Sequence, residues 1–132
     1  MTTPLYAYTI VYVDDVEASI AFFEAAFGLD RRFLVETGDY GELETGATAL
    51  AFAQHATARR NLGHDYVDAA TSPRPLGVEI GLVVDDVAAA CDRAVAAGAD
   101  LLTAATTKPW GQTVAYVRCP DGTLVELCTA VG

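Results

Sequence analysis

Two stretches of this chain repeat the same order of apolar and polar positions. Each begins with an apolar run that ends in Val-Asp-Asp-Val, continues through an alanine-rich segment and closes on a glycine, as 10–29 reads IVYVDDVEASIAFFEAAFGL and 81–100 reads GLVVDDVAAACDRAVAAGAD. The apolar runs are typical of strands, and apolar residues at i, i+4, i+7 and i+11 after the first motif predict a helix. Asp15 and Asp86 are positioned to cap the two helices, and Gly28 suits a left-handed helix end. The pattern therefore predicts a duplicated unit of about seventy residues.

The rest of each copy predicts three short strands after the helix. In the first copy the expected strands cover 6–13, 32–37, 40–44 and 48–53, and in the second 78–84, 101–105, 113–118 and 124–129. Between the copies, 55–76 contains several Gly, Pro and Asn residues without a sustained period, which predicts a linker, with at most one helical turn at 56–60. We expect an α+β fold in one domain, 1–132, built from two βαβββ modules at 5–54 and 77–130 around the linker 55–76. A linker of this length could also serve as a lid.

Charge and cysteine content narrow the classes of partner and compartment. The formal net charge is −10, which disfavours nucleic acid and anionic membrane surfaces as partners. The chain has no apolar run of about 18 to 20 residues, so a cytoplasmic protein is expected. Three cysteines without a CxxC pair argue against a disulfide scaffold. Because 52% of the residues are hydrophobic, some apolar surface is expected to line a pocket or close a homodimer interface.

Several local motifs carry a resemblance to a known family. They are the Phe22-Phe23 pair followed by Phe27-Gly28-Leu29, the helix end Ala96-Ala97-Gly98-Ala99, the run Lys108-Pro109-Trp110-Gly111-Gln112, and Pro120-Asp121-Gly122-Thr123-Leu124-Val125-Glu126. Together with the repeat, these resemble the vicinal oxygen chelate superfamily, which contains glyoxalase I, extradiol dioxygenases, fosfomycin-resistance enzymes and bleomycin-resistance proteins. The resemblance covers essentially the whole chain and implies paired concave sheets with a ligand cleft.

The resemblance also implies positions at which the family holds a divalent metal, on the first and last strand of each module. Counting from the motifs places these positions at Tyr8 and Leu50 in the first copy and at Glu79 and Glu126 in the second. A neutral phenol is a poor ligand for such ions, and leucine cannot ligate. We therefore expect no metal site of the family type and no cofactor.

Strand alternation indicates what the cleft holds instead. If the family's ligand positions face it, Tyr6, Tyr8, Ile10 and Tyr12 line it from one strand, and Leu50 and Phe52 from another. In the second copy the same reasoning selects Glu79, Gly81 and Val83, then Leu124, Glu126 and Cys128, with Val114, Tyr116 and Arg118 on the hairpin partner and Trp110 in the loop before it. The result is an aromatic cleft suited to a flat organic molecule, although residues at this spacing also occur as ordinary core or dimer contacts.

The charged and nucleophilic candidates have two interpretations. Two neighbouring carboxylates raise each other's proton affinity, so Glu79 and Glu126 are candidates for acid/base catalysis or for binding a cationic ligand. Alternatively, Glu126 pairs with Arg118 or hydrogen-bonds Tyr116. His55 and His64 lie in the linker, where an exposed histidine without a chemical role is the default expectation. Cys119 lacks a nearby histidine in the sequence that would mark it as a nucleophile.

The hypothesis we favour is a metal-independent protein, similar to bleomycin-resistance proteins, that sequesters a hydrophobic or aromatic natural product. It would act as a homodimer without nucleic-acid or membrane partners, with ligand contacts at Tyr8, Tyr12, Leu50, Phe52, Glu79, Trp110, Tyr116, Arg118 and Glu126. Two alternatives stay open. One is a lyase, isomerase or dioxygenase with an atypical metal site or a glutamate acid/base, and the other is a noncatalytic interaction domain whose cleft is filled by its own side chains.

Overall fold

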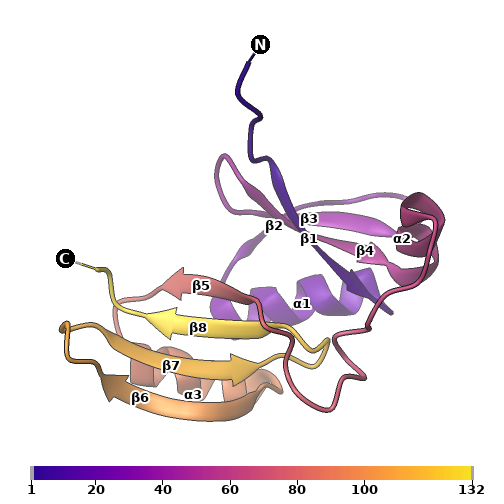
Figure 1. The fold of residues 1–132 in the computed structure, drawn as a ribbon. Helices are drawn as coiled ribbons and strands as arrows, with labels where there is room; N and C mark the ends of the chain where they lie inside the picture. Colours follow the sequence, from indigo (N-terminus) through magenta and orange to yellow (C-terminus); the bar gives the residue numbers. More distant parts are fainter. Residues whose placement is uncertain (1, 132) are drawn as a thin grey trace. The chain divides into compact units, whose positions relative to one another are not determined.

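The computed structural model describes residues 2–131 and contains two four-stranded sheets, each with helices (Figure 1). In chain order the elements are β1 (Tyr8–Val13), α1 (Val16–Phe27), β2 (Asp30–Leu34), β3 (Tyr40–Glu44), β4 (Ala49–Gln54), α2 (His55–Leu62), β5 (Glu79–Val83), α3 (Val87–Ala97), β6 (Asp100–Thr107), β7 (Thr113–Arg118) and β8 (Leu124–Cys128). The predicted α+β fold with two βαβββ modules is confirmed. The chain divides into two compact units, one running up to Glu24 and resuming at Leu29–Tyr66, the other made of Ala25–Gly28 and the residues from Val67 onward.

The first sheet has the strand order β1-β4-β3-β2, with β1 parallel to β4 and the other pairs antiparallel. Helix α1 covers one face of this sheet. The ring of Phe23 on α1 lies 5.1 Å from the ring of Phe52 on β4, and both side chains are fully buried. Burying side chains of this size stabilises the fold by roughly 1.5 to 3 kcal/mol each, so this contact anchors the core of the first unit.

Helix α1 packs tightly against the first sheet at Gly41 on β3. A Cβ atom built on this glycine would lie 2.5 Å from Cδ1 of Ile20 and 3.0 Å from the carbonyl oxygen of Phe33. Ile20 is fully buried, so little room exists for it to move. Gly41 therefore faces α1, and by alternation its neighbours Tyr40 and Glu42 face away from the helix.

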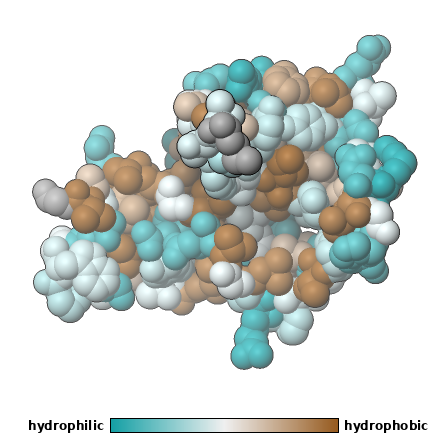
Figure 2. Space-filling model, turned by 45° about the horizontal axis from the view of Figure 1, so that its top comes forward, coloured by the Kyte–Doolittle hydropathy of each residue, from teal (hydrophilic) through white to brown (hydrophobic). Residues whose placement is uncertain are grey.

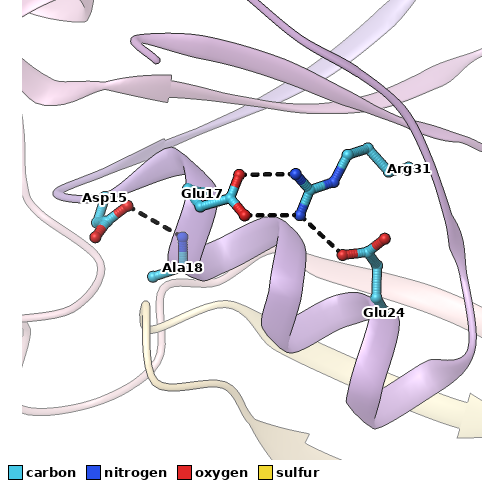
Figure 3. Close-up of polar contacts among 5 residues, drawn as sticks. All are labelled: Asp15, Glu17, Ala18, Glu24 and Arg31. Carbon is cyan, nitrogen blue, oxygen red and sulfur yellow. Dashed lines mark hydrogen bonds and ion pairs between the residues drawn. The ribbon is translucent and has the colours of Figure 1, made fainter.

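The start of α1 is fixed by polar contacts (Figure 3). Oδ1 of Asp15 accepts a hydrogen bond of 3.0 Å from the backbone N–H of Ala18, which is the capping predicted from the sequence. The guanidinium of Arg31 on β2 reaches back to the helix, where it donates to both carboxylate oxygens of Glu17, at 2.7 and 3.0 Å, and to Glu24 at 2.9 Å. These contacts tie the outer strand of the first sheet to its helix.

The second sheet repeats this plan with the strand order β5-β8-β7-β6. Helix α3 begins at the predicted cap, where Oδ1 of Asp86 accepts a 3.0 Å hydrogen bond from the backbone of Ala89. The core of this unit alternates along β7 and β8, where Ala115, Val117, Val125 and Leu127 are fully buried on the face toward α3; Val114, on the opposite face of β7, is also fully buried. The two copies therefore build their cores in the same way.

The segment between the modules is more ordered than a linker. Helix α2 spans eight residues, longer than the single turn expected, because Ala58 and His55 are buried against the first unit. Further along, Arg118 on β7 donates through Nη2 to the backbone oxygens of Ala69 and Ser72, at 2.8 Å each. The second half of the segment is thus attached to the second sheet.

Among the described residues, no helix is long and apolar enough to cross a membrane. Large apolar side chains do reach the surface, and Figure 2 shows such residues, in brown, interspersed with polar ones in teal. The three cysteines, Cys91, Cys119 and Cys128, are buried free thiols.

Candidate functional site

Each sheet has one face turned away from its helix, and we call this the open face. In the first unit the register aligns Tyr8 with Ala49 and Ile10 with Ala51, while Glu42 on β3 also lies opposite Ala51. Strand β4 therefore contributes only methyl groups to the open face, through Ala49, Ala51 and Ala53. The larger side chains come from the strands on either side of it, namely Tyr8, Ile10 and Tyr12 from β1 and Tyr40 and Glu42 from β3.

The predicted contacts Leu50 and Phe52 are wrong. Phe52 packs on Phe23 of α1, and Leu50, two residues away on the same strand, shares that helix-covered face. The error has a physical cause, because the glycine of the turn before β4 lies one residue farther from its strand than the glycine of the turn before β8 does. Gly46 precedes the start of β4 by three residues, whereas Gly122 precedes the start of β8 by two. Ala51, and not Leu50, therefore corresponds to Glu126.

A tyrosine and a carboxylate form a pair on the open face of the first sheet. The hydroxyl of Tyr40 donates a hydrogen bond of 2.7 Å to Oε2 of Glu42, and Nη1 of Arg32 lies 3.4 Å from Oε1 of the same carboxylate. Glu42 is only 5% exposed, which is unusual for a glutamate. Burial, followed by the hydrogen bond to Glu42, raises the pKa of Tyr40, so this phenol stays protonated at neutral pH.

Aromatic rings surround this pair. Tyr8 is 57% exposed, and the ring of Phe33 lies 6.1 Å from that of Tyr40. Tyr12 is half-buried, and its ring packs 4.8 Å from the ring of Tyr66, which follows α2. Of the two tyrosines on β1, Tyr8 is thus the more exposed, whereas Tyr12 already has an aromatic neighbour.

The open face of the second sheet holds a comparable pair next to a second acid. The hydroxyl of Tyr116 on β7 donates a 2.7 Å hydrogen bond to Oε1 of Glu126 on β8, the arrangement expected if the hairpin register placed them opposite each other. This bond to Glu126 and burial raise the pKa of Tyr116 to about 12. Burial and the nearby charge of Glu126 raise the pKa of Glu79 above its usual value. The two glutamates therefore interact, and Glu79 binds its proton more tightly than a free side chain does.

Arg118 and Trp110 also lie outside the core of the second unit. Arg118 does not pair with Glu126, because its Nη2 donates to the carbonyls of Ala69 and Ser72. Trp110 is 66% exposed in the loop before β7, and its indole Nε1 donates a 2.9 Å hydrogen bond to Oε1 of Gln112. That bond holds the ring in one orientation while leaving much of its surface in solvent.

The remaining candidates, His55 and Cys119, are both buried and packed against other residues. His55 is buried at the start of α2, where its ring contacts that of Tyr66 and its Nδ1 hydrogen-bonds the Tyr66 hydroxyl, so the expectation of an exposed histidine is wrong. The reason is that α2 folds back onto β4 instead of leaving the sheet. Burial raises the pKa of Cys119, which keeps this thiol protonated and unreactive.

A cavity of about 290 Å³ lies in the second unit on the helix side of the sheet. Its lining comprises Ala26, Phe27, Val84, Asp85, Asp86, Ala89, Ala90, Arg93 and Leu127. Asp86 caps α3, and Nε of Arg93 donates a 2.8 Å hydrogen bond to the carbonyl of Ala25. Because its polar groups serve the ends of two helices, this cavity is structural in character and separate from the open face.

The side chains at the metal positions that the resemblance implied do not fit a metal. In the first unit these positions hold Tyr8 and Ala51, of which only the phenol carries a donor atom. In the second unit they hold Glu79 and Glu126, and one carboxylate oxygen of Glu126 already accepts the Tyr116 hydrogen bond. None of the four positions supplies an imidazole, and the described residues include no group of three or more His, Cys, Asp and Glu that could hold an ion.

Comparison with known proteins agrees with this architecture. The profile of the Glyoxalase/Bleomycin resistance protein/Dioxygenase superfamily matches residues 6–127. This chain belongs to that superfamily. A probable lactoylglutathione lyase from Vibrio parahaemolyticus serotype O3:K6 (strain RIMD 2210633) is 29% identical over 126 residues, which cover 91% of this chain and 86% of that protein.

Solved structures of other proteins have a similar fold. A glyoxalase-related enzyme from Fulvimarina pelagi superposes with a TM-score of 0.83 at 25% identity, covering 97% of this chain and 89% of that one. TioX from Micromonospora sp. ML1 has the same fold, with a TM-score of 0.63 at 22% identity and coverage of 96% and 98%. The fold predicted from the repeat is therefore the superfamily fold.

The sequence reasoning missed Tyr40, Glu42 and Arg32. A signal was present, because β3 alternates Tyr40, Glu42 and Glu44 with Gly41 and Leu43, and this pattern separates a polar face from a core face. The missing information was the register that places Glu42 opposite Ala51.

Proposed function

We propose that this protein binds a hydrophobic or aromatic small molecule on the open faces of its sheets without a metal, and that it sequesters this molecule as bleomycin-resistance proteins do. The observation that carries the proposal is the donor set at the superfamily's metal positions. Tyrosine and alanine stand there in one unit and two coupled glutamates in the other. Compared with a protein that holds a metal at these positions, this chain has fewer metal-binding side chains there and more aromatic surface for a ligand to contact.

Exposed aromatic side chains support the binding role. Tyr8 and Trp110 keep more than half of their surface in solvent, so their rings offer contact area that a ligand can cover. A well-placed ring contact contributes about 0.5 to 1.5 kcal/mol beyond the area that it buries. Association as a homodimer without nucleic-acid or membrane partners is part of the proposal, in keeping with the net charge of −10.

Calorimetric titration with a planar aromatic probe, 1-naphthol, tests the proposal on protein dialysed against a chelator. Binding should persist after dialysis and weaken about fivefold to tenfold in Tyr8→Ala and in Trp110→Ala. Val95→Ala is the matched control, because it removes an exposed apolar side chain from α3, away from the open face. Wild-type affinity in both aromatic variants would contradict the proposal, as would a stoichiometric transition metal that survives dialysis.

One observation favours a second candidate, an enzyme that uses Glu79 for proton transfer. The raised pKa of Glu79, caused by burial and by Glu126, moves this carboxyl toward the range in which a general acid or base works near neutral pH. The relative from Vibrio parahaemolyticus bears the name of a lyase. Lactoylglutathione lyase activity that is present in the wild type and lost in Glu79→Gln would favour this candidate over sequestration.

A further inference from the structure

Both open faces present a tyrosine hydroxyl whose proton is already engaged. Tyr40 donates to Glu42, and Tyr116 donates to Glu126, each at 2.7 Å. An ionised carboxylate only accepts hydrogen bonds, so the direction of these two bonds cannot be reversed. Each hydroxyl therefore has only its oxygen lone pairs left for another partner.

We infer that the two tyrosines act as fixed hydrogen-bond acceptors, and that the ligand is an aromatic molecule with O–H or N–H donors rather than one with acceptors alone. This inference rests on the proposed function and narrows it to a class of ligand. Phenols, aromatic amines and amide N–H groups belong to that class. Ethers and quinones without donors lie outside it.

Electrostatics reinforces the direction of both bonds. Bonds to an ionised acceptor are stronger than bonds between neutral groups, so the Tyr40 and Tyr116 protons stay on the carboxylate side. Burial, followed by the hydrogen bond to Glu42, raises the pKa of Tyr40, and the hydrogen bond to Glu126 raises the pKa of Tyr116, so both phenols keep the proton that they donate. An acceptor-only ligand would meet oxygen lone pairs and leave its own polar atom unsatisfied.

The surrounding structure holds the two tyrosine–glutamate hydrogen bonds in this direction before a ligand binds. Glu42 is 5% exposed, and Arg32 lies on the side of its second oxygen, so the carboxylate has little freedom to turn away from Tyr40. In the second unit Glu79 adds another negative charge close to Glu126. The net charge of −10 further disfavours an anionic ligand.

A matched pair of probes tests the inference. 1-Naphthol and 1-methoxynaphthalene share the same ring system, but only the first has an O–H donor. Their dissociation constants are measured by calorimetry for the wild type and for the double variant Glu42→Gln/Glu126→Gln. A glutamine amide can accept from the tyrosine hydroxyl or donate to it, so in the variant the direction of the bond is no longer fixed and the hydroxyl can turn to donate to the ligand.

The wild type should bind 1-naphthol about tenfold more tightly than 1-methoxynaphthalene, and the double variant should reduce that preference to about threefold or less. Glu36→Gln/Asp92→Asn is the control, because it removes two exposed carboxylates that lie outside both pairs and should keep the full preference. If the double variant does not fold, Glu126→Gln alone should still reduce the preference, since Glu126 is only half-buried.

The outcomes separate the two proposals. Equal affinity of the wild type for both probes overturns the inference but leaves the binding function intact. A full tenfold preference in the folded double variant also overturns it. If the wild type binds neither probe, the proposed function fails and the inference fails with it.

Discussion

The two sheets carry the same chemical pair on their open faces but take it from different strands. In the second unit the tyrosine is on β7 and the carboxylate on β8, across a strand pair, whereas in the first unit both lie two residues apart on β3. Ala51 occupies the position that corresponds to Glu126, and Glu42 the position that corresponds to Tyr116. After duplication, the two halves thus arrived at similar polar pairs by different substitutions.

The surroundings of the two pairs differ more than the pairs do. Glu42 is buried beside the guanidinium of Arg32, while Glu126 is half-buried beside a second acid, Glu79. The first pair is therefore electrostatically compensated, and the second carries excess negative charge. This difference predicts that the first pair contributes more to stability and that the second responds more to pH.

The largest expected effect comes from the strand that holds the first pair. Gly41→Ala should lower the free energy of unfolding by about 2 to 3 kcal/mol, because the new Cβ overlaps the buried side chain of Ile20. Gly81→Ala on β5 is the matched control, since open space surrounds that glycine, and its effect should stay within about 0.5 kcal/mol. Urea unfolding of both variants measures the difference, and equal effects would contradict the close approach of α1 to β3.

The next prediction compares the two carboxylates directly. Glu42→Ala should cost about 2 kcal/mol, because it leaves the half-buried Tyr40 hydroxyl without its acceptor and removes one of the two carboxylates that pair with Arg32. Glu126→Ala should cost less, about 0.5 to 1 kcal/mol, since it also removes the repulsion with Glu79. Chemical unfolding curves measure the free energy of unfolding of both variants. A larger decrease for Glu126→Ala than for Glu42→Ala would contradict the prediction.

Ionisation of the second pair gives a smaller, spectroscopic effect. The pKa of Tyr116 is raised to about 12, first by the hydrogen bond to Glu126. Glu126→Gln removes the charge and should return this pKa toward 10, the ordinary value for tyrosine. Alkaline titration followed by tyrosinate absorbance detects the change, with Glu36→Gln as the control. An unchanged titration curve would mean that Glu126 does not control this phenol.

The smallest expected effect is a change in pH dependence. The pKa of Glu79 is raised in the folded protein by burial and by Glu126, so its contribution to stability is complete below the unfolded pKa, near 4.5. That contribution is lost as the pH rises through the raised value. Glu79→Gln should therefore flatten the decline in unfolding free energy above pH 4.5, and thermal unfolding across a pH series measures it. If the unfolding free energy of Glu79→Gln fell more steeply with pH than that of the wild type, the prediction would be contradicted.

The fold was predictable because its signals are local and appear twice. The Val-Asp-Asp-Val motifs, the apolar spacing of α1 and the closing glycines each depend on residues within one element. The capping of α1 by Asp15 and of α3 by Asp86 follows from the same short-range rules. Long-range packing changed the strand ends by a few residues and extended α2.

The site was only partly predictable because it depends on register. The turn glycine lies one residue farther from the start of β4 than from the start of β8, so Leu50 and Phe52 are on the helix-covered face and Ala51 is on the open face. The pairing of Tyr116 with Glu126 was foreseen as an alternative, since the tight turn between β7 and β8 determines which residues lie opposite each other. The spacing between the turn glycine and the strand, more than residue type, separates the correct assignments from the wrong ones.

The close packing around Gly122 limits where a sequence can be inserted into this chain. A Cβ at this position would lie 2.2 Å from the backbone oxygen of Ala69, and the residue has a φ of 89°. Affinity tags or fluorescent reporters should therefore be inserted at Gly77, which is exposed and has open space around it, and kept away from the stretch around Ala69.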